Sequence, residues 1–214
     1  MIIHWLGESC FLIKQSNGRR ILLDPINLST NKISNLNPSI ITLSNNYIYD
    51  KINPISTTKK INIINSFGEY QYNNILINGY LSYCDNMNGQ KRGENIIYYI
   101  ETDNIKLCHL GHLGHKLSNE ILSKLINIDI LFIPIGGHFT INSTEALNII
   151  NTLKPKYIVP MCYRTSGSSK FLDSPKTFLT SSKNIRIINT DFIDTDVLFS
   201  DSNMTTLVIK ESLI

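Results

Sequence analysis

Short apolar runs separated by turn residues constrain the fold of this chain more than any other feature of its sequence. In the first half such runs lie at residues 2–6, 11–14, 21–23, 40–43, 61–64, 75–81, 96–101 and 105–108. The sequences SNG at 16–18 and DN at 103–104 separate neighbouring runs, which predicts tight turns between strands at both places. Runs of this length, bounded by turns, are typical of buried strands. The first half is therefore predicted to be a meander of short strands.

The second half alternates predicted helices with predicted strands. Ser118 is placed to cap a helix to about residue 125, and Asn142 and Glu145 have the spacing of a capping box for a helix to about residue 153. Ser174 and Pro175 mark the start of a third helix. Apolar runs at 128–135, 157–159, 185–188 and 205–209 are predicted strands. This order predicts one domain, residues 1–214, with two sheets and helices packed outside them.

Composition excludes several classes of protein. With 42% hydrophobic and 17% charged residues in 214 positions, the chain has the composition of a globular domain. The formal net charge is only +3 and the basic pairs are scattered, so no nucleic-acid partner is expected. No apolar run approaches the roughly 18 residues of a membrane span. We therefore expect no membrane partner either.

The four cysteines, Cys10, Cys84, Cys108 and Cys162, lie far apart and form no CxxC pair. This spacing argues against a disulfide framework and is typical of proteins in a reducing compartment. The first residues, MIIHW, also lack the pattern of a secretory signal. The sequence therefore predicts a cytoplasmic protein, and it leaves the oligomeric state unknown.

Several short motifs follow one another in an order that resembles a known family. They are WLGESCF (5–11), LLDP (22–25), FGEY (67–70), KRGEN (91–95), CHLGHLGH (108–115), IPIGG (133–137), FTI (139–141) and VPMCY (159–163). Together they resemble the small metallo-β-lactamase-fold hydrolases related to the ascorbate-6-phosphate lactonase group. The resemblance implies an α/β fold, the metallo-β-lactamase-like αββα four-layer sandwich. It also implies hydrolysis by two closely spaced metal ions that activate water.

The residues at the metal-ligand positions implied by this resemblance depart from the family pattern. The segment at 45–50, NNYIYD, stands where the family has HxHxDH, and a one-residue shift aligns Asp50 with the Asp of that motif. Cys84 stands where the family has a later His, and Cys162 stands where it has the final His. His112 stands where the family has the Asp that both metals share. Asn and Tyr are poor zinc ligands beside imidazole and carboxylate. A dinuclear site of the usual kind is therefore not expected.

Three interpretations of the replaced positions remain open at this point. Cys84, His112 and Cys162, with Asp50 as a fourth candidate, are themselves metal ligands, and thiolate with imidazole favours a single zinc or iron ion. Alternatively, Cys84 or Cys162 is a nucleophile that His112 activates. The plainest interpretation is that cysteine, a small and often buried residue, fills space where a ligand is no longer needed.

On this basis the sequence favours a catalytically degenerate metallo-β-lactamase-fold protein, which keeps the scaffold and the pocket, binds no metal and serves to bind a small-molecule ligand. The alternative is a metal-dependent hydrolase with a remodelled Cys/His site for one zinc or iron ion. Its substrate would be a small ester, a lactone or a phosphate-bearing molecule, as the resemblance implies. Nucleic-acid processing has no support, because the sequence contains neither a basic stripe nor an extra domain.

Overall fold

Two β-sheets packed face to face form the centre of the molecule. The computed structural model describes residues 1–47, 49–50, 52–54, 60–198 and 204–214. The first sheet has the order β13-β1-β2-β3-β4-β5 and the second the order β12-β14-β11-β10-β9-β8-β7-β6. The first contains β1 (Ile2–Trp5), β2 (Phe11–Lys14), β3 (Arg20–Leu23), β4 (Ile40–Thr42), β5 (Asn62–Ile64) and β13 (Phe192–Asp194). The second contains β6 (Gly68–Tyr72), β7 (Ile75–Tyr83), β8 (Glu94–Thr102), β9 (Ile105–His109), β10 (Ile130–Pro134), β11 (Tyr157–Met161), β12 (Ile185–Ile187) and β14 (Thr205–Val208).

The strands of the six-stranded sheet send alternate side chains into two hydrophobic clusters. Phe11 and Ile13 of β2 belong to the main core between the sheets, where the rings of Phe11 and Phe132 lie 4.5 Å apart. Leu12 points the other way, into a smaller cluster that also contains Ile33 and Leu36 of α1 (Thr30–Leu36). Because both faces of such strands are buried, their sequences read as continuous apolar runs rather than as alternating patterns.

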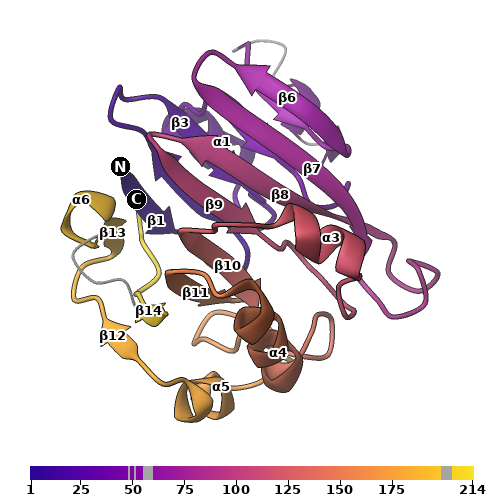
Figure 1. The fold of residues 1–214 in the computed structure, drawn as a ribbon. Helices are drawn as coiled ribbons and strands as arrows, with labels where there is room; N and C mark the ends of the chain where they lie inside the picture. The colour runs from indigo at the N-terminus through magenta and orange to yellow at the C-terminus, as the bar shows by residue number, and fades with distance from the viewer. Residues whose placement is uncertain (48, 51, 55–59, 199–203) are drawn as a thin grey trace.

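Helices cover the outer faces of both sheets and complete the four layers. Figure 1 shows α3 (Asn119–Lys124) and α4 (Ser143–Leu153) in front of the eight-stranded sheet, with α1 and the first strands behind it. Ser118 caps α3, and Asn142 and Glu145 form the predicted capping box of α4. The remaining helices are α5 (Lys176–Ser181) and α6 (Thr195–Leu198). The αββα architecture expected from the sequence is confirmed, and no helix in the described segments is long and apolar enough to cross a membrane.

Several elements were not expected from the sequence. The FGEY segment leads into β6, whose Gly68, Glu69 and Tyr70 pair with β7. This strand forms the edge of its sheet and is only partly buried, so it lacks the apolar run that identifies a central strand. Helices α1 and α6 and strand β13 were not predicted either. The partner of β13 is β1, about 190 residues away, which no local pattern can indicate.

Strand direction divides the molecule into two functionally different ends. β3 and β4 run parallel in one sheet, and β9, β10 and β11 run parallel in the other. The loops that follow these strands therefore emerge at one edge, here called the loop end. The tight turns β2–β3, β6–β7 and β8–β9 lie at the opposite edge, here called the turn end. In α/β folds ligands bind beyond the carboxyl ends of parallel strands, which directs attention to the loop end.

Candidate functional site

A pocket of about 280 Å³ opens at the loop end, where loops from both sheets meet. Three of the four predicted metal ligands, Cys84, His112 and Cys162, line it. The fourth, Asp50, is exposed and is not one of the lining residues. The complete lining is Glu8, Ile26, Tyr47, Cys84, Arg92, His112, Phe139, Thr140, Cys162, Ser169 and Leu172. Folding therefore gathers three chemically capable side chains from positions far apart in the sequence.

His112 is held by contacts from several different segments of the chain. Its backbone N–H donates to Asn95 Oδ1 at 2.7 Å, and its ring Nδ1 lies 3.2 Å from the amide nitrogen of Asn45. On the other side of the ring, Nε2 lies 3.3 Å from the hydroxyl of Ser9. Burial lowers the pKa of His112, and the nearby Asp24 carboxylate opposes this shift only in part. At neutral pH the imidazole is therefore neutral, with the lone pair of Nδ1 facing the Asn45 amide N–H and the proton on Nε2 facing Ser9.

A buried carboxylate, Asp24, lies directly behind His112. Its Oδ1 accepts a hydrogen bond from the backbone N–H of Ser44 at 2.6 Å, and its Oδ2 lies 3.8 Å from His112 Nδ1 and 3.9 Å from His109 Nδ1. His109 Nε2 faces the carbonyl oxygen of Ser9 at 2.9 Å, so Nε2 carries the proton and Nδ1 presents a lone pair. Burial raises the pKa of Asp24, and His112 and Ser44 partly offset the rise. Asp24 Oδ2 and His109 Nδ1 are thus acceptors that no described protein group uses.

The two cysteines of the pocket are protonated thiols. Burial, reinforced by the charge of Asp24, raises the pKa of Cys84 to about 11, and Cys84 Sγ donates to the carbonyl oxygen of Glu94 at 3.4 Å. Burial also raises the pKa of Cys162 well above its usual value. The thiolate, not the thiol, is the nucleophile, so these surroundings do not support a thiol nucleophile. A metal ion would have to displace the thiol protons on binding.

The residues present decide which metal centre this pocket suits. A dinuclear centre does not fit, because the segment 45–50 contains no histidine and His112 replaces the shared carboxylate. For one ion the types of donor group fit, since two thiols and a neutral imidazole line one pocket and the buried Asp24 carboxyl lies behind the imidazole. Asp24 contributes to the electrostatic environment of Cys84, His112 and Cys162 alike. No three His, Cys, Asp or Glu side chains in the described segments already stand at metal-binding spacing.

The loop between β7 and β8 is held in shape by Asp85 and Arg92. The Asp85 carboxylate accepts four backbone N–H groups of residues 87–92 at 2.7–3.0 Å. Arg92 donates from Nε to the carbonyl oxygen of Cys84 at 2.9 Å and from its terminal nitrogen to that of His138 at 2.8 Å. The guanidinium therefore joins two loops at the pocket mouth. Sequence analysis gave neither residue a role, although Arg92 belongs to the KRGEN motif.

Two glycines bring the pocket loops into close contact. A side chain at Gly114 would collide with the backbone of Cys84, and one at Gly136 with the carbonyl oxygen of Cys162. In both cases the obstacle is main chain rather than a flexible side chain. These positions therefore fix where Cys84 and Cys162 stand, which motif spacing alone did not reveal.

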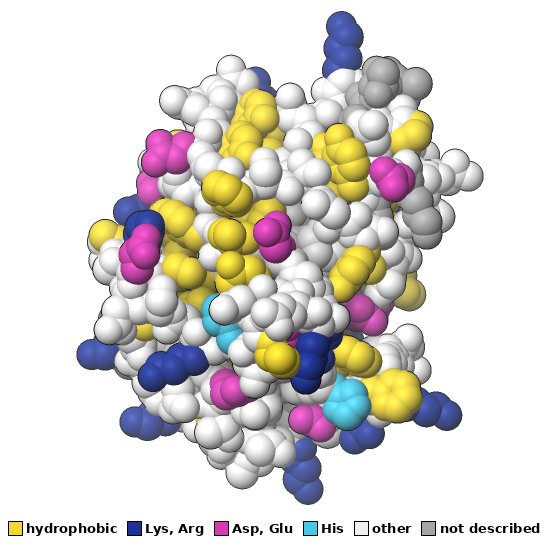
Figure 2. All heavy atoms as spheres, turned by 90° about the vertical axis from the view of Figure 1, so that its right-hand side faces the viewer, with side chains coloured by type: hydrophobic (Ala, Val, Ile, Leu, Met, Phe, Trp, Pro, Cys, Tyr) yellow, Lys and Arg dark blue, Asp and Glu magenta, His cyan; other side chains and the backbone are white. Residues whose placement is uncertain are grey.

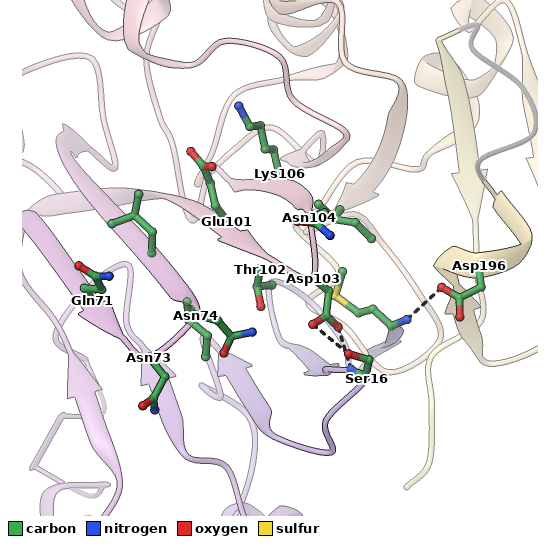
Figure 3. A pocket seen from close by; sticks show the side chains of 14 residues that line it. Ser16, Gln71, Asn73, Asn74, Glu101, Thr102, Asp103, Asn104, Lys106 and Asp196 are labelled. Carbon is green, nitrogen blue, oxygen red and sulfur yellow. Dashed lines mark hydrogen bonds and ion pairs between the residues drawn. The ribbon is translucent and has the colours of Figure 1, made fainter.

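A larger hollow, of about 750 Å³, lies at the turn end. Figure 3 shows its polar lining, in which Asp103 accepts hydrogen bonds from Ser16 and the amino terminus pairs with Asp196. Its lining contains amides, hydroxyls, carboxylates and one lysine, but no cysteine or histidine. Because it lacks the thiols and the imidazole found at the loop end, we place the candidate site at the loop end.

Comparison with known proteins identifies the family and the fold. The family model described as "Beta-lactamase superfamily domain" matches residues 2–162. A UPF0173 metal-dependent hydrolase of Thermoplasma volcanium is 25% identical over 190 residues, which cover 76% of this chain and 83% of that protein. One from Thermococcus onnurineus is 42% identical over 69 residues, 32% of this chain and 31% of that protein. A crystal structure from Thermotoga maritima, described as a Zn-dependent hydrolase of the metallo-β-lactamase superfamily, has a TM-score of 0.74 at 24% identity and covers 98% of this chain and 99% of that one.

These relatives correct one expectation and leave another as a prediction. The catalytically degenerate, metal-free protein favoured by the sequence is contradicted, because the relatives that align with most of the chain carry the name of metal-dependent hydrolases. The sequence interpretation took the replacement of the usual ligands as loss of function, although three of the replacing residues, Cys84, His112 and Cys162, are of types that bind metals in other proteins. The finer resemblance to lactonase-like members stays a prediction.

Proposed function

Because the chain belongs to the β-lactamase superfamily, we propose that it is a metal-dependent hydrolase with one ion at a remodelled site. Cys84, His112 and Cys162 would hold the ion, with the buried carboxylate of Asp24 beside them. The observation that carries the proposal is that these three replaced ligand positions hold Cys, His and Cys and line one pocket. Random loss of a site would leave no reason for all three replacements to be metal ligands.

The chain's own residues supply the rest of the chemistry. The chemistry that zinc provides in such sites is Lewis-acid activation of water and of the scissile bond. Asn45 and Ser9 orient the ring of His112, and a metal ion would replace one of these two partners while the other keeps the ring in place. Asp24 stabilises any positive charge that develops on His112, because its free oxygen lies 3.8 Å from Nδ1. The apolar walls exclude bulk water and so strengthen these interactions.

The proposed substrate is a small ester, lactone or phosphate-bearing molecule, since the pocket measures only about 280 Å³ and small-molecule pockets span roughly 300–1,000 Å³. We place the protein in the cytoplasm, because all four cysteines are unpaired and reducing compartments keep thiols in that state. Neither nucleic acid nor a membrane is proposed as a partner.

Metal analysis of two matched double variants tests the proposal. Protein is purified without chelator or affinity-tag metal, and its zinc and iron are measured by elemental analysis. The wild type should contain about one equivalent, and Cys84→Ala/Cys162→Ala should contain almost none. The control, Cys10→Ala/Cys108→Ala, removes two buried cysteines that do not line the pocket and should keep the metal.

Hydrolysis provides the second measurement. Activity on small aryl esters, lactones and phosphate esters should be lost on chelation and return with zinc. Metal-free wild-type protein that stays inactive after zinc addition would refute the proposal. Retention of the metal by the Cys84→Ala/Cys162→Ala variant would show instead that the ion binds elsewhere.

A further inference from the structure

Aromatic rings from two loops form a rim beside the candidate pocket. His138 and Phe139 follow β10, and Phe171 belongs to the loop after β11. The rings of His138 and Phe171 are stacked with centroids 5.7 Å apart, and Phe139 meets them edge-on at 5.5 Å and 6.5 Å. These three residues are called the aromatic rim. They place a connected aromatic surface at the pocket mouth.

The aromatic rim is exposed to solvent although it is apolar. Phe171 is 66% exposed and Phe139 is 43% exposed, and Tyr47, which also lines the pocket, is 66% exposed. In the lower part of Figure 2 hydrophobic side chains lie beside a histidine and a basic side chain. Single exposed apolar residues are ordinary, but several that converge on a pocket are typical of ligand binding. Phe139 belongs to both the rim and the pocket lining, so the two form one continuous surface.

The pocket lining combines apolar side chains with one cation. Ile26 and Leu172 contribute aliphatic surface, and Arg92 is the only Lys or Arg among the described residues that line this pocket. Both mapped acceptors of the Arg92 side chain are uncharged backbone carbonyls, those of Cys84 and His138. These bonds fix the guanidinium plane without neutralising its charge, and no described carboxylate pairs with it. A fixed guanidinium with remaining N–H donors is well suited to bind a carboxylate or phosphate.

We propose that the pocket is selective for small aryl anions, with an aromatic ring against the aromatic rim and an anionic group on Arg92. Glu8 is the one acidic residue of the lining, and it disfavours a second anionic group. The substrate class is therefore an aryl or arylalkyl compound with a single acidic group and a hydrolysable bond near His112. This inference rests on the proposed function for the location of the site, but binding alone can test it.

Calorimetric titration with three probes tests the two parts of the inference. Phenylacetate carries both ring and charge, phenylacetamide carries the ring alone, and acetate carries the charge alone. Phenylacetate should bind saturably, and the other two at least about tenfold more weakly, because each lacks one of the two contacts. The titrations are run on protein as purified and after chelation, so that a metal-carboxylate contact is recognised as such.

Matched variants assign the contacts to residues. Arg92→Gln should weaken phenylacetate binding at least about tenfold, and Phe171→Ala about fivefold. Lys91→Gln removes a neighbouring exposed charge, and Phe67→Ala removes another exposed Phe outside the pocket. Both controls should change the affinity less than about twofold. If Arg92→Gln disturbs the loops, Arg92→Lys keeps the charge but loses the planar fork and should bind with intermediate affinity.

Several outcomes would overturn the inference. If phenylacetate and phenylacetamide bind with equal affinity, Arg92 does not bind the anionic group. If phenylacetate and acetate bind with equal affinity, the aromatic rim does not bind the ring. Equal losses in Lys91→Gln and Arg92→Gln would show a general charge effect. Protein that takes up no metal and hydrolyses none of the test substrates, but still binds phenylacetate, would refute the proposed hydrolase and leave this inference standing. Metal-loaded, hydrolytically active protein that does not bind phenylacetate would refute this inference and leave the proposed hydrolase standing.

Discussion

The two ends of the sandwich present hollows of different size and different chemistry. The turn-end hollow measures about 750 Å³ and the loop-end pocket about 280 Å³. At the turn end, the half-buried carboxylate of Asp103 already accepts hydrogen bonds from the backbone N–H and the hydroxyl of Ser16. At the loop end, by contrast, two thiols, an imidazole and a guanidinium line one cavity beside a buried carboxylate with a free oxygen. Convergence of reactive groups, rather than volume, therefore identifies the candidate site.

The backbone conformation of the lining residues also differs between the two hollows. At the turn end, positive φ occurs at Asn73, Asp103 and Asn104, and Asn and Asp tolerate this conformation. At the loop end, it occurs at Glu8 (φ 46°) and Cys162 (φ 51°), residue types that adopt it at a cost of about 1–2 kcal/mol each. Such conformations persist where the surrounding packing imposes them, and they cluster at functional sites. Among the residues that line the two hollows, positive φ thus falls on Asn and Asp at the turn end and on Glu and Cys at the loop end.

The largest expected effect comes from separating two loops of the site. Gly136→Ala places a methyl group on the carbonyl oxygen of Cys162 and should lower the free energy of unfolding by about 3 kcal/mol, because main chain has to move. Gly167→Ala is the matched control, since a methyl group there meets no atom within 4 Å. Urea unfolding measures both. Equal stability of the two variants would contradict the close packing described for the loop end.

A pH titration distinguishes the buried polar groups of the loop end from the exposed ones of the turn end. Burial lowers the pKa of His109 from 6.5 to about 4, and its bond to Ser9 opposes the shift only in part. Because the pKa of His109 is lower in the folded protein than in the unfolded chain, neutral His109 favours folding. This contribution to the free energy of unfolding is complete above pH 6.5 and is lost as the pH falls toward 4. Between pH 7 and pH 5 this loss should amount to about 2 kcal/mol.

Urea unfolding of the wild type and of His109→Gln at several pH values measures this effect. Gln retains a donor for the carbonyl oxygen of Ser9 but does not titrate, so its stability should fall less steeply between pH 7 and pH 5. Parallel pH curves for the two proteins would refute the role of His109. Asp103→Ala at the turn end should leave the slope over this pH range almost unchanged.

The smallest expected effect tests the backbone contrast. Glu8→Gly should raise the free energy of unfolding by about 0.5–1 kcal/mol, since glycine adopts positive φ without steric cost. Asn104→Gly at the turn end should change it by less than about 0.5 kcal/mol. Equal shifts in the urea midpoint, with unchanged m-values, would indicate that the two ends carry the same strain.

The core of the fold was predictable because it depends on local patterns. The apolar runs that became β2, β4 and β10, and the caps at Ser118 and Asn142, appear in the structure where the sequence placed them. Motif order also indicated that Cys84, His112 and Cys162 belong to one site. Asp24 belongs to the LLDP motif, but nothing in its local sequence indicates that it is buried 3.8 Å from His112.

The sequence by itself determined the family, the two-sheet architecture and the residue types that replace the usual metal ligands, because these depend on periodicity, turn chemistry and motif order. Tertiary structure alone decided which of those residues meet. It separated exposed Asp50 from the pocket, brought the orphaned oxygen of Asp24 against His112, and fixed Arg92 between two loops under the aromatic rim. The physical reason is that burial and long-range contact set the protonation, orientation and strain of a side chain, and both arise only after distant segments pack together.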